Sequence, residues 1–310
     1  MNLTRLRVFT EVARTGTFAA AADALSFTPS AVSQQMARLE AEVGAPLLER
    51  TTRGVHLTSA GRVLLPRAQD ILARVADAHA ELTALRGDPS GAVRLGSFPT
   101  ATQTLGTRAL ALLRERHPEV RCAIVDDEPH ALLAALRDRR VELAIVFRLP
   151  GRAIGRDYAG RLVASDDVAE LTPLLHDPFV AVVPAGAPAG LDALRRTPII
   201  GSRGTPGMDA VIAACQAAGF APRFTGHALP DYGSHQALAA AGDGVAIVPR
   251  LAAAVPRPGT AVHALDFGGP VREILLARAA GGFASAAAEA TAQVLRDVAA
   301  ERFPQVGDVR

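Results

Sequence analysis

Hydrogen-bonding side chains gather on one helical face between residues 28 and 43 of this 310-residue sequence. Thr28 and Pro29 predict the start of a helix, because threonine caps a first turn and proline fits the first helical position. Apolar residues at helical spacing predict its buried stripe: Val32, Met36, Leu39 and Val43. The opposite face carries short or planar side chains: Ser30, Ser33, Gln34 and Ala37, with Arg38 at the margin. Such side chains match the hydrogen-bonding patterns of base edges in a DNA major groove, although an ordinary solvated face accounts for these residues equally well.

The segment after this helix predicts a β-hairpin. Short strand patterns at residues 45–50 and 55–57 flank a turn at residues 51–54, with Arg53 near its tip. An arginine at a protruding tip can enter the minor groove or contact a phosphate. Most isolated turn arginines are simply solvated. A DNA contact by Arg53 is therefore indicated only in combination with the polar helix face that precedes the hairpin.

Two shorter helices are predicted upstream, and they would position the polar face. Leu3, Leu6, Phe9 and Val12 form an apolar stripe that ends at residues 15–16. Thr17 is placed to cap the next helix, residues 18–25, whose small alanines allow close packing.

A long helix is predicted from residue 58 to residue 85. Its heptad positions are all apolar: Leu64, Ala68, Ile71, Val75, Ala78, Leu82 and Leu85. A helix of about 28 residues spans roughly 42 Å, which is too long to pack only on a small domain. We therefore expect its seam to pair with the same helix of a second subunit, the alternative being packing along its own C-terminal domain.

A hinge is predicted at residues 87–91, where glycine and proline follow the long helix. Beyond it, strand-like runs alternate with helical ones, which predicts an α/β fold. The runs are residues 92–96, 123–125, 143–147, 179–183 and 245–248, and the alanine-rich stretch 284–292 reads as a helix.

The amino-acid composition limits the classes of protein to which this chain can belong. Hydrophobic residues make up 49% and charged residues 21%, as in a packed globular protein. No run reaches the roughly 18 apolar residues of a membrane helix and residues 1–5 do not begin a secretion signal, so we expect a cytoplasmic protein. The net charge of +2 is too small to argue for nucleic-acid binding by itself.

Motifs for other chemistry are missing from the sequence. The cysteines, Cys122 and Cys215, have neither metal-binding nor local redox spacing, although their proximity in space stays open. No H-E-x-x-H or G-x-S-x-G motif occurs, so we expect no metal site and no enzyme.

Three blocks, residues 18–25, 28–40 and 47–61, together resemble the LysR-type transcriptional regulators in order and spacing. The resemblance implies an α/β protein overall: a winged helix-turn-helix head, a linker helix that dimerises, and an effector-binding domain of two Rossmann-like lobes, similar to type 2 periplasmic binding proteins. The implied boundaries are 1–58 for the head (helix-turn-helix about 18–37), 59–86 for the linker helix, 87–91 for the hinge and 92–302 for the effector domain, with lobe I at about 92–163 and 268–302 and lobe II at about 164–267.

The resemblance implies a regulator that binds double-stranded DNA as a dimer or tetramer, with RNA polymerase as a further partner and no membrane association. The implied DNA contacts are Thr28, Ser30, Ser33, Gln34, Arg38 and Arg53. Many family members have glutamine where Pro29 stands and arginine where Gln34 stands, so base preferences do not transfer. A glutamine that reads a base favours adenine.

The resemblance also implies an effector site between the lobes, with no other cofactor. The implied residues are Ser97, Phe98, Thr100, Phe147, Ser202, Arg203, Thr205 and Tyr232. Ser97 and Thr100 precede a helix N-terminus, which suits an anionic or amide group, and plain N-capping accounts for them equally well. The alternative function is a small-molecule sensor or solute-binding protein without DNA activity, which the missing export signal and the intact head disfavour.

Overall fold

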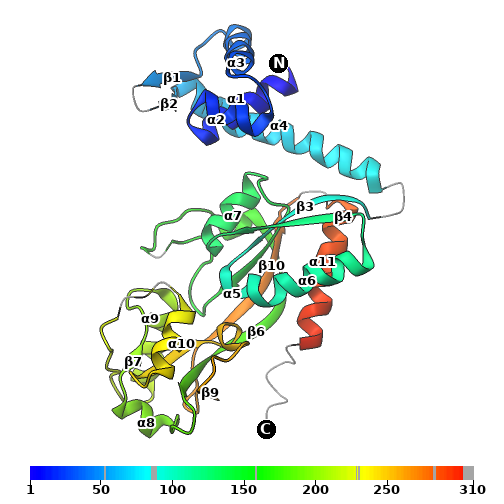
Figure 1. Cartoon of the computed structure of the whole chain (residues 1–310). Coiled ribbons are helices and arrows are strands. Elements are labelled where there is room, and N and C mark those ends of the chain that lie inside the picture. The colour runs from blue at the N-terminus through cyan, green and yellow to red at the C-terminus, as the bar shows by residue number, and fades with distance from the viewer. Residues whose placement is uncertain are drawn as a thin grey trace. The chain divides into compact units, whose positions relative to one another are not determined.

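A computed structural model of the chain describes residues 1–51, 54–84, 89–157, 159–227, 229, 231–281 and 284–302. The chain divides into two compact units (Figure 1). The N-terminal unit comprises Met1–Gly87 with Phe283–Ser285, and the C-terminal unit comprises Asp88–Gly282 with Ala286–Arg310.

Three helices form the body of the N-terminal unit: α1 (Leu3–Thr15), α2 (Phe18–Leu25) and α3 (Pro29–Val43). The predicted helices and caps are confirmed, because Thr17 accepts a hydrogen bond from the Ala20 N–H and Thr28 accepts one from the Ala31 N–H. Gly44 ends α3 at φ 75°, a left-handed conformation that residues with a Cβ rarely adopt.

The core of this unit is built from one face of each helix. Its buried side chains include Leu6, Phe9, Val12, Ala21, Ala22, Val32, Met36 and Leu39. The prediction that Val43 is buried was wrong, since its side chain is 37% exposed, and Leu3 of the apolar stripe in α1 is 45% exposed. Leu3 is the first residue of α1 and Val43 the last residue of α3, so they extend beyond the packed region.

The predicted hairpin is confirmed as antiparallel strands β1 (Leu48–Thr51) and β2 (Gly54–Leu57). The Val55 N–H donates to the Gly16 carbonyl at 2.9 Å, which anchors the hairpin to the turn between α1 and α2. Arg53, the predicted tip residue, lies outside the described residues.

Helix α4 (Ser59–Ala84) follows the hairpin. Leu64, Ala68 and Leu72 pack into the core of the N-terminal unit. Further along, Ile71, Val75, Ala78 and Leu82 line an apolar groove together with Arg74. The last predicted seam residue, Leu85, lies outside the described residues.

The C-terminal unit is built on one mixed sheet with the strand order β4-β3-β5-β10-β6-β8-β7, and β9 also pairs with β6. The strands are β3 (Gly91–Ser97), β4 (Val120–Asp126), β5 (Leu143–Arg148), β6 (Ala169–Pro184), β7 (Ile199–Ile200), β8 (Val245–Pro249), β9 (Thr260–Ala264) and β10 (Val271–Ala279). Because β3 runs parallel to β4 and β5 with helical crossovers, the unit has the predicted α/β fold.

Strand β6 joins two halves of this unit. Residues 169–178 of β6 pair with β10 in the first half, and residues 179–184 pair with β8 and β9 in the second half (Figure 1). The first half contains α5 (Pro99–Ala101), the π-helix η1 (Thr102–Gly106), α6 (Thr107–Arg116), α7 (Pro129–Arg137), η2 (Asp166–Val168) and α11 (Ala286–Arg302). The second half contains α8 (Leu191–Arg196), α9 (Pro206–Ala217), α10 (Tyr232–Ala240) and η3 (Arg250–Ala253).

Within the described part of the chain, no helix combines the length and apolar character needed to cross a membrane.

Candidate nucleic-acid interface and ligand cavity

The polar face of α3 is exposed on the N-terminal unit. Ser30, Gln34 and Arg38 are exposed and Ser33 is half-buried. Thr28 Oγ1 lies 3.0 Å from Ser30 Oγ while it caps the helix. The face therefore presents hydroxyl, amide and guanidinium groups together, the mixture that can hydrogen-bond to base edges and phosphates.

Packing on the other side of α3 holds this face outward. Val32, Met36 and Leu39 are at most 2% exposed and lock the rotation of the helix about its own axis. Glu40 Oε1 accepts hydrogen bonds from the Leu47 N–H at 2.8 Å and the Leu48 N–H at 3.2 Å, which connects α3 to the first strand of the hairpin.

A cavity of about 810 Å³ lies between the two halves of the C-terminal unit. Six of the eight sequence-predicted effector residues line it: Phe98, Thr100, Phe147, Ser202, Thr205 and Tyr232. They come from the end of β5, from α5 and its N-cap, from the loop that leads into α9, and from the start of α10. A volume of this size accommodates a small organic molecule.

Ser97 and Arg203 do not line the cavity, which corrects the prediction for these two residues. Ser97 is fully buried at the end of β3, where successive side chains point to opposite faces, and its neighbour Phe98 takes the cavity side. The Arg203 guanidinium carbon lies 5.2 Å from the centre of the Phe224 ring, so the side chain stacks on its own half.

A buried ion pair that the sequence analysis missed borders the cavity. Arg272 on β10 is 3% exposed and Asp177 on β6 is 1% exposed. The Arg272 Nε and Nη2 atoms donate to Asp177 Oδ2 at 3.0 and 2.5 Å. Such a pair is tolerated in an apolar interior only when the remaining polar atoms are also satisfied.

Further hydrogen bonds extend this pair into both halves. Arg272 Nη2 also donates to Thr100 Oγ1 at 3.1 Å, in the first half. Asp177 Oδ1 accepts the Leu251 N–H at 2.9 Å, in the second half. The network thus joins the two walls of the cavity through one guanidinium and one carboxylate.

Two aromatic rings flank the guanidinium. Its carbon lies 5.2 Å from the centre of the Phe98 ring and 4.7 Å from that of Phe147, and these rings meet edge to face at 5.0 Å. Cation–π attraction in a desolvated site adds to the ion pair. Phe98 and Phe147, both predicted as effector residues, therefore also hold the Arg272 guanidinium in place.

The predicted hydroxyl residues of the second half are already hydrogen-bonded. Ser202 Oγ donates to the Leu229 carbonyl at 2.6 Å and accepts the Leu229 N–H at 3.2 Å. Thr205 Oγ1 donates to the Ser202 carbonyl at 3.1 Å and caps α9 by accepting the Met208 N–H. These hydroxyls shape the loop, which leaves them little free capacity for a ligand.

Gln236 offers an acceptor to the cavity that the sequence did not reveal. Its side chain is 6% exposed, and Nε2 donates to the Ala252 carbonyl at 2.8 Å. This bond fixes the orientation of the amide, and Oε1 has no hydrogen-bond partner among the described residues. A buried acceptor without a partner costs free energy, so a ligand that brings an N–H or O–H group there gains affinity.

His235 and Tyr232 stand beside this acceptor on α10. Burial lowers the pKa of His235, so its ring is neutral at pH 7, and burial raises the pKa of Tyr232. The rings meet edge to face at 5.7 Å. Neither ring therefore carries a charge at pH 7, whereas the carboxylate of the neighbouring Asp231 also lines this side of the cavity.

The two cysteines belong to different packed clusters. Cys122 on β4 is half-buried against the core of the first half, and Cys215 on α9 is fully buried in the second half. Burial raises the pKa of each thiol to about 11. Both are therefore protonated at neutral pH, and a protonated thiol is a poor nucleophile.

No group of three or more histidine, cysteine, aspartate or glutamate side chains suited to a metal ion occurs in the part of the chain that the structure describes.

Comparisons with known families and proteins agree with this geometry. Residues 3–62 match the family model of the bacterial regulatory helix-turn-helix protein, lysR family, and residues 86–300 match that of the LysR substrate binding domain. Together the two matches cover both units.

Similar proteins extend the match over nearly the whole chain. A probable hydrogen peroxide-inducible genes activator of Mycobacterium avium is 30% identical over 86% of this chain and 83% of its own length. The protein with that description from Mycobacterium xenopi is 37% identical over 64% of this chain and 96% of its own length.

Among solved structures, full-length OxyR of Pseudomonas aeruginosa has the same fold, with a TM-score of 0.70, 21% identity, and coverage of 96% of this chain and 94% of the other. The family consists of transcriptional regulators that bind double-stranded DNA and form oligomers, and they are not enzymes. The chain belongs to the LysR family of bacterial transcriptional regulators.

Proposed function

We propose that this regulator contacts operator DNA through the exposed face of α3 and the tip of the hairpin, and that a small-molecule effector in the cavity of the C-terminal unit alters that contact. The observation that carries the proposal is the cavity of about 810 Å³ whose walls come from both halves. Operator binding implies a place of action in the cytoplasm, with RNA polymerase as a further partner.

The proposed DNA contacts divide by chemistry. Gln34 would read a base edge, where its planar amide favours adenine. Thr28, Ser30 and Ser33 would contact bases or phosphates near the helix start, and Arg38 would contact the phosphate backbone. Arg53 is proposed to reach the minor groove from the hairpin.

The proposed effector contacts are Phe98, Thr100, Phe147, Ser202, Thr205 and Tyr232, to which we add Gln236. Ser202 and Thr205 would contact the effector as part of the wall, because their hydroxyls already hold the loop. The aromatic residues would hold an apolar body, and Gln236 Oε1 would accept a hydrogen bond from it. Because Thr100 and Leu251 are tied to the same ion pair, a ligand between the halves would alter their relative orientation. That movement, passed to the oligomer, would change the spacing of the DNA-binding units.

Hydrogen peroxide, named for the mycobacterial relatives, is a less suitable signal for this chain. Peroxide sensing by a cysteine requires a reactive, accessible thiolate. Cys215 is fully buried, and burial raises the pKa of Cys122 and of Cys215 to about 11. We therefore infer that the effector is bound and that thiol oxidation is not the signal.

A gel-shift titration tests the proposal. The full-length protein is titrated against the DNA upstream of its own gene and of any divergent neighbour, with excess unrelated DNA as competitor, and compounds are then screened for changes in mobility. We expect specific binding that weakens with salt. Gln34→Ala should weaken it by about 1–3 kcal/mol without changing the effector affinity.

Gln236→Leu is the complementary variant. It should reduce the response to the effector and leave DNA binding without effector at the wild-type level. A folded oligomer that binds no specific DNA in a genome-wide selection would support the alternative, a sensor without DNA activity.

A further inference from the structure

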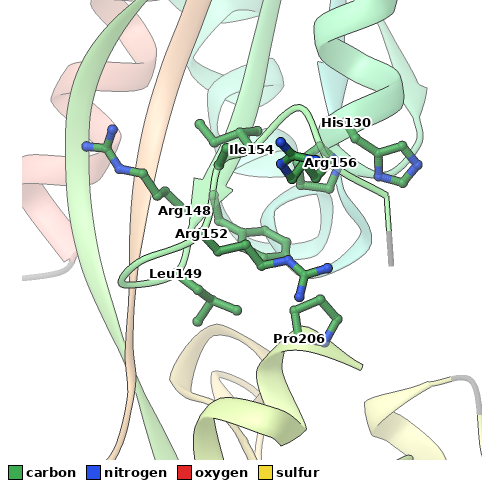
Figure 2. A pocket seen from close by; sticks show the side chains of 10 residues that line it. His130, Arg148, Leu149, Arg152, Ile154, Arg156 and Pro206 are labelled. Carbon is green, nitrogen blue, oxygen red and sulfur yellow. The ribbon is translucent and has the colours of Figure 1, made fainter. Parts of the chain in front are cut away.

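A second pocket in the C-terminal unit is distinguished by arginines. Arg148 ends β5, and Arg152 and Arg156 follow at every fourth position in the next loop. All three line this pocket together with His130 of α7 (Figure 2). It shares only Phe147 and Pro206 with the larger cavity. We call it the arginine pocket.

The charge of the arginine pocket is not balanced by its own lining, which includes no acidic residue among those that the structure describes. Arg148 is neutralised by Glu273, to which its Nε and Nη2 atoms donate at 3.1 and 2.6 Å. Arg152 and Arg156 instead donate to the carbonyls of Asp157 and Gly160, at 3.0 and 2.8 Å. Neither of these two has a carboxylate partner among the described residues.

Two carboxylates near the arginine pocket, Asp157 and Asp166, already form hydrogen bonds within the loop after β5 or to it. Asp157 pairs with Arg161 at 2.7 Å. Asp166 accepts the Ile154 N–H at 3.2 Å and the Gly155 N–H at 2.8 Å. A Cβ at Gly155 would lie 1.7 Å from the Ala164 carbonyl oxygen, so the loop packs closely where the arginines are presented.

Two helix N-termini add positive potential to the same pocket. Pro129 is the first residue of α7 and Pro206 the first residue of α9, and both line it. The partial positive charge that the helix dipole places at such ends favours anions. Figure 2 shows the Arg152 guanidinium directed toward Pro206, whereas Arg148 points away from it.

We propose that the arginine pocket binds a small oxyanion, held by the guanidinium groups of Arg152 and Arg156. Planar guanidinium forks match the oxygens of phosphate, sulfate or carboxylate groups. Because Pro206 comes from the second half and the arginines from the first, a bound oxyanion bridges the two halves beside the effector cavity. The site does not depend on the effector proposed above, since its lining residues are different apart from the two shared ones.

Calorimetry on the full-length protein tests the site. Inorganic phosphate, sulfate and acetate are titrated at constant ionic strength, which separates free inorganic anions from a carboxylate group as the source of the oxyanion. We expect at least one of them to bind with a Kd of about 1 mM or tighter. Arg152→Gln and Arg156→Gln should each raise that Kd about tenfold, the effect of losing roughly 1.4 kcal/mol.

Arg114→Gln is the matched control, because Arg114 is exposed on α6 and its substitution removes the same charge elsewhere. It should change the Kd less than about twofold. The anomalous signal of selenate in crystals then locates the anion, expected between Arg152 and Arg156.

Any of three results would overturn the proposal: equal weakening by Arg114→Gln, a selenate peak only elsewhere, or a peak in the pocket without calorimetric binding. Arg152→Lys and Arg156→Lys are the conservative controls for misfolding of the glutamine variants. They keep the positive charge, so they should retain part of the affinity if the oxyanion site exists. If the arginine pocket binds no oxyanion, the proposed function still stands or falls by the gel-shift assay, because that assay measures the mobility of DNA and not the binding of small anions.

Discussion

At the scale of single residues, Arg272 and Asp177 set opposite charges where almost no solvent reaches. Removing charges from water costs several kcal/mol per ion, and mutual attraction offsets this only with good geometry and full hydrogen bonding. Thr100, Leu251 and the two phenylalanine rings supply the additional contacts. The pair therefore adds little net stability, and its main role is to fix how the two halves of the C-terminal unit meet.

Breaking this pair from one side should destabilise the C-terminal unit strongly. Arg272→Met alone leaves the Asp177 carboxylate buried and uncompensated, and we expect a loss of about 3–5 kcal/mol in urea unfolding. The double variant Arg272→Met with Asp177→Leu removes both charges and should recover much of that loss. Strictly additive losses in the double-mutant cycle would contradict this coupling.

At the scale of elements, α4 divides into two functional parts. Leu64, Ala68 and Leu72 secure its first turns to the N-terminal unit. The groove of Ile71, Val75, Ala78 and Leu82 has apolar residues at heptad spacing, and the Leu82 side chain is 63% exposed. Since the family forms oligomers, we propose that this groove pairs with α4 of a second copy.

Charge placed in that groove should weaken the dimer. Leu82→Arg puts a guanidinium where the seam needs an apolar contact, so sedimentation velocity should show a shift toward monomer at micromolar concentration. Arg67→Gln, on an exposed part of the same helix, should leave the sedimentation profile unchanged. A wild-type profile for Leu82→Arg would mean that the groove is not the dimer seam.

At the scale of the whole molecule, the chain combines a DNA-binding unit with a ligand-binding unit, and its signal must arise in the second. The peroxide-related descriptions of the mycobacterial proteins make thiol chemistry the obvious alternative signal. Burial argues against it, because it raises the pKa of both thiols to about 11 and so keeps them protonated at pH 7.

Hydrogen peroxide should therefore leave DNA binding unchanged. In the gel-shift assay, wild-type protein treated with peroxide and the double variant Cys122→Ser with Cys215→Ala should match untreated wild type in operator affinity. Thiol titration under native conditions should show slow labelling of both cysteines. A peroxide-dependent shift that the double variant abolishes would restore a redox mechanism.

Local sequence rules determined the elements of this protein well. Thr28, Pro29 and Gly44 delimit α3, and the hairpin lies where its turn pattern predicted. The exposed face with Ser30 and Gln34 followed from periodicity. Capping, glycine conformation and helical spacing act over a few residues, so the sequence alone contains them.

Tertiary structure alone decided which side chains meet at the cavity. Arg272 and Asp177 are 95 residues apart in sequence, and only the pairing of β10 with β6 brings them together. Ser97 and Phe98 are neighbours, yet only Phe98 lines the cavity, because strand geometry directs them to opposite sides. Contacts between distant segments depend on register and on how whole elements pack, and a local pattern of residues does not encode either of these.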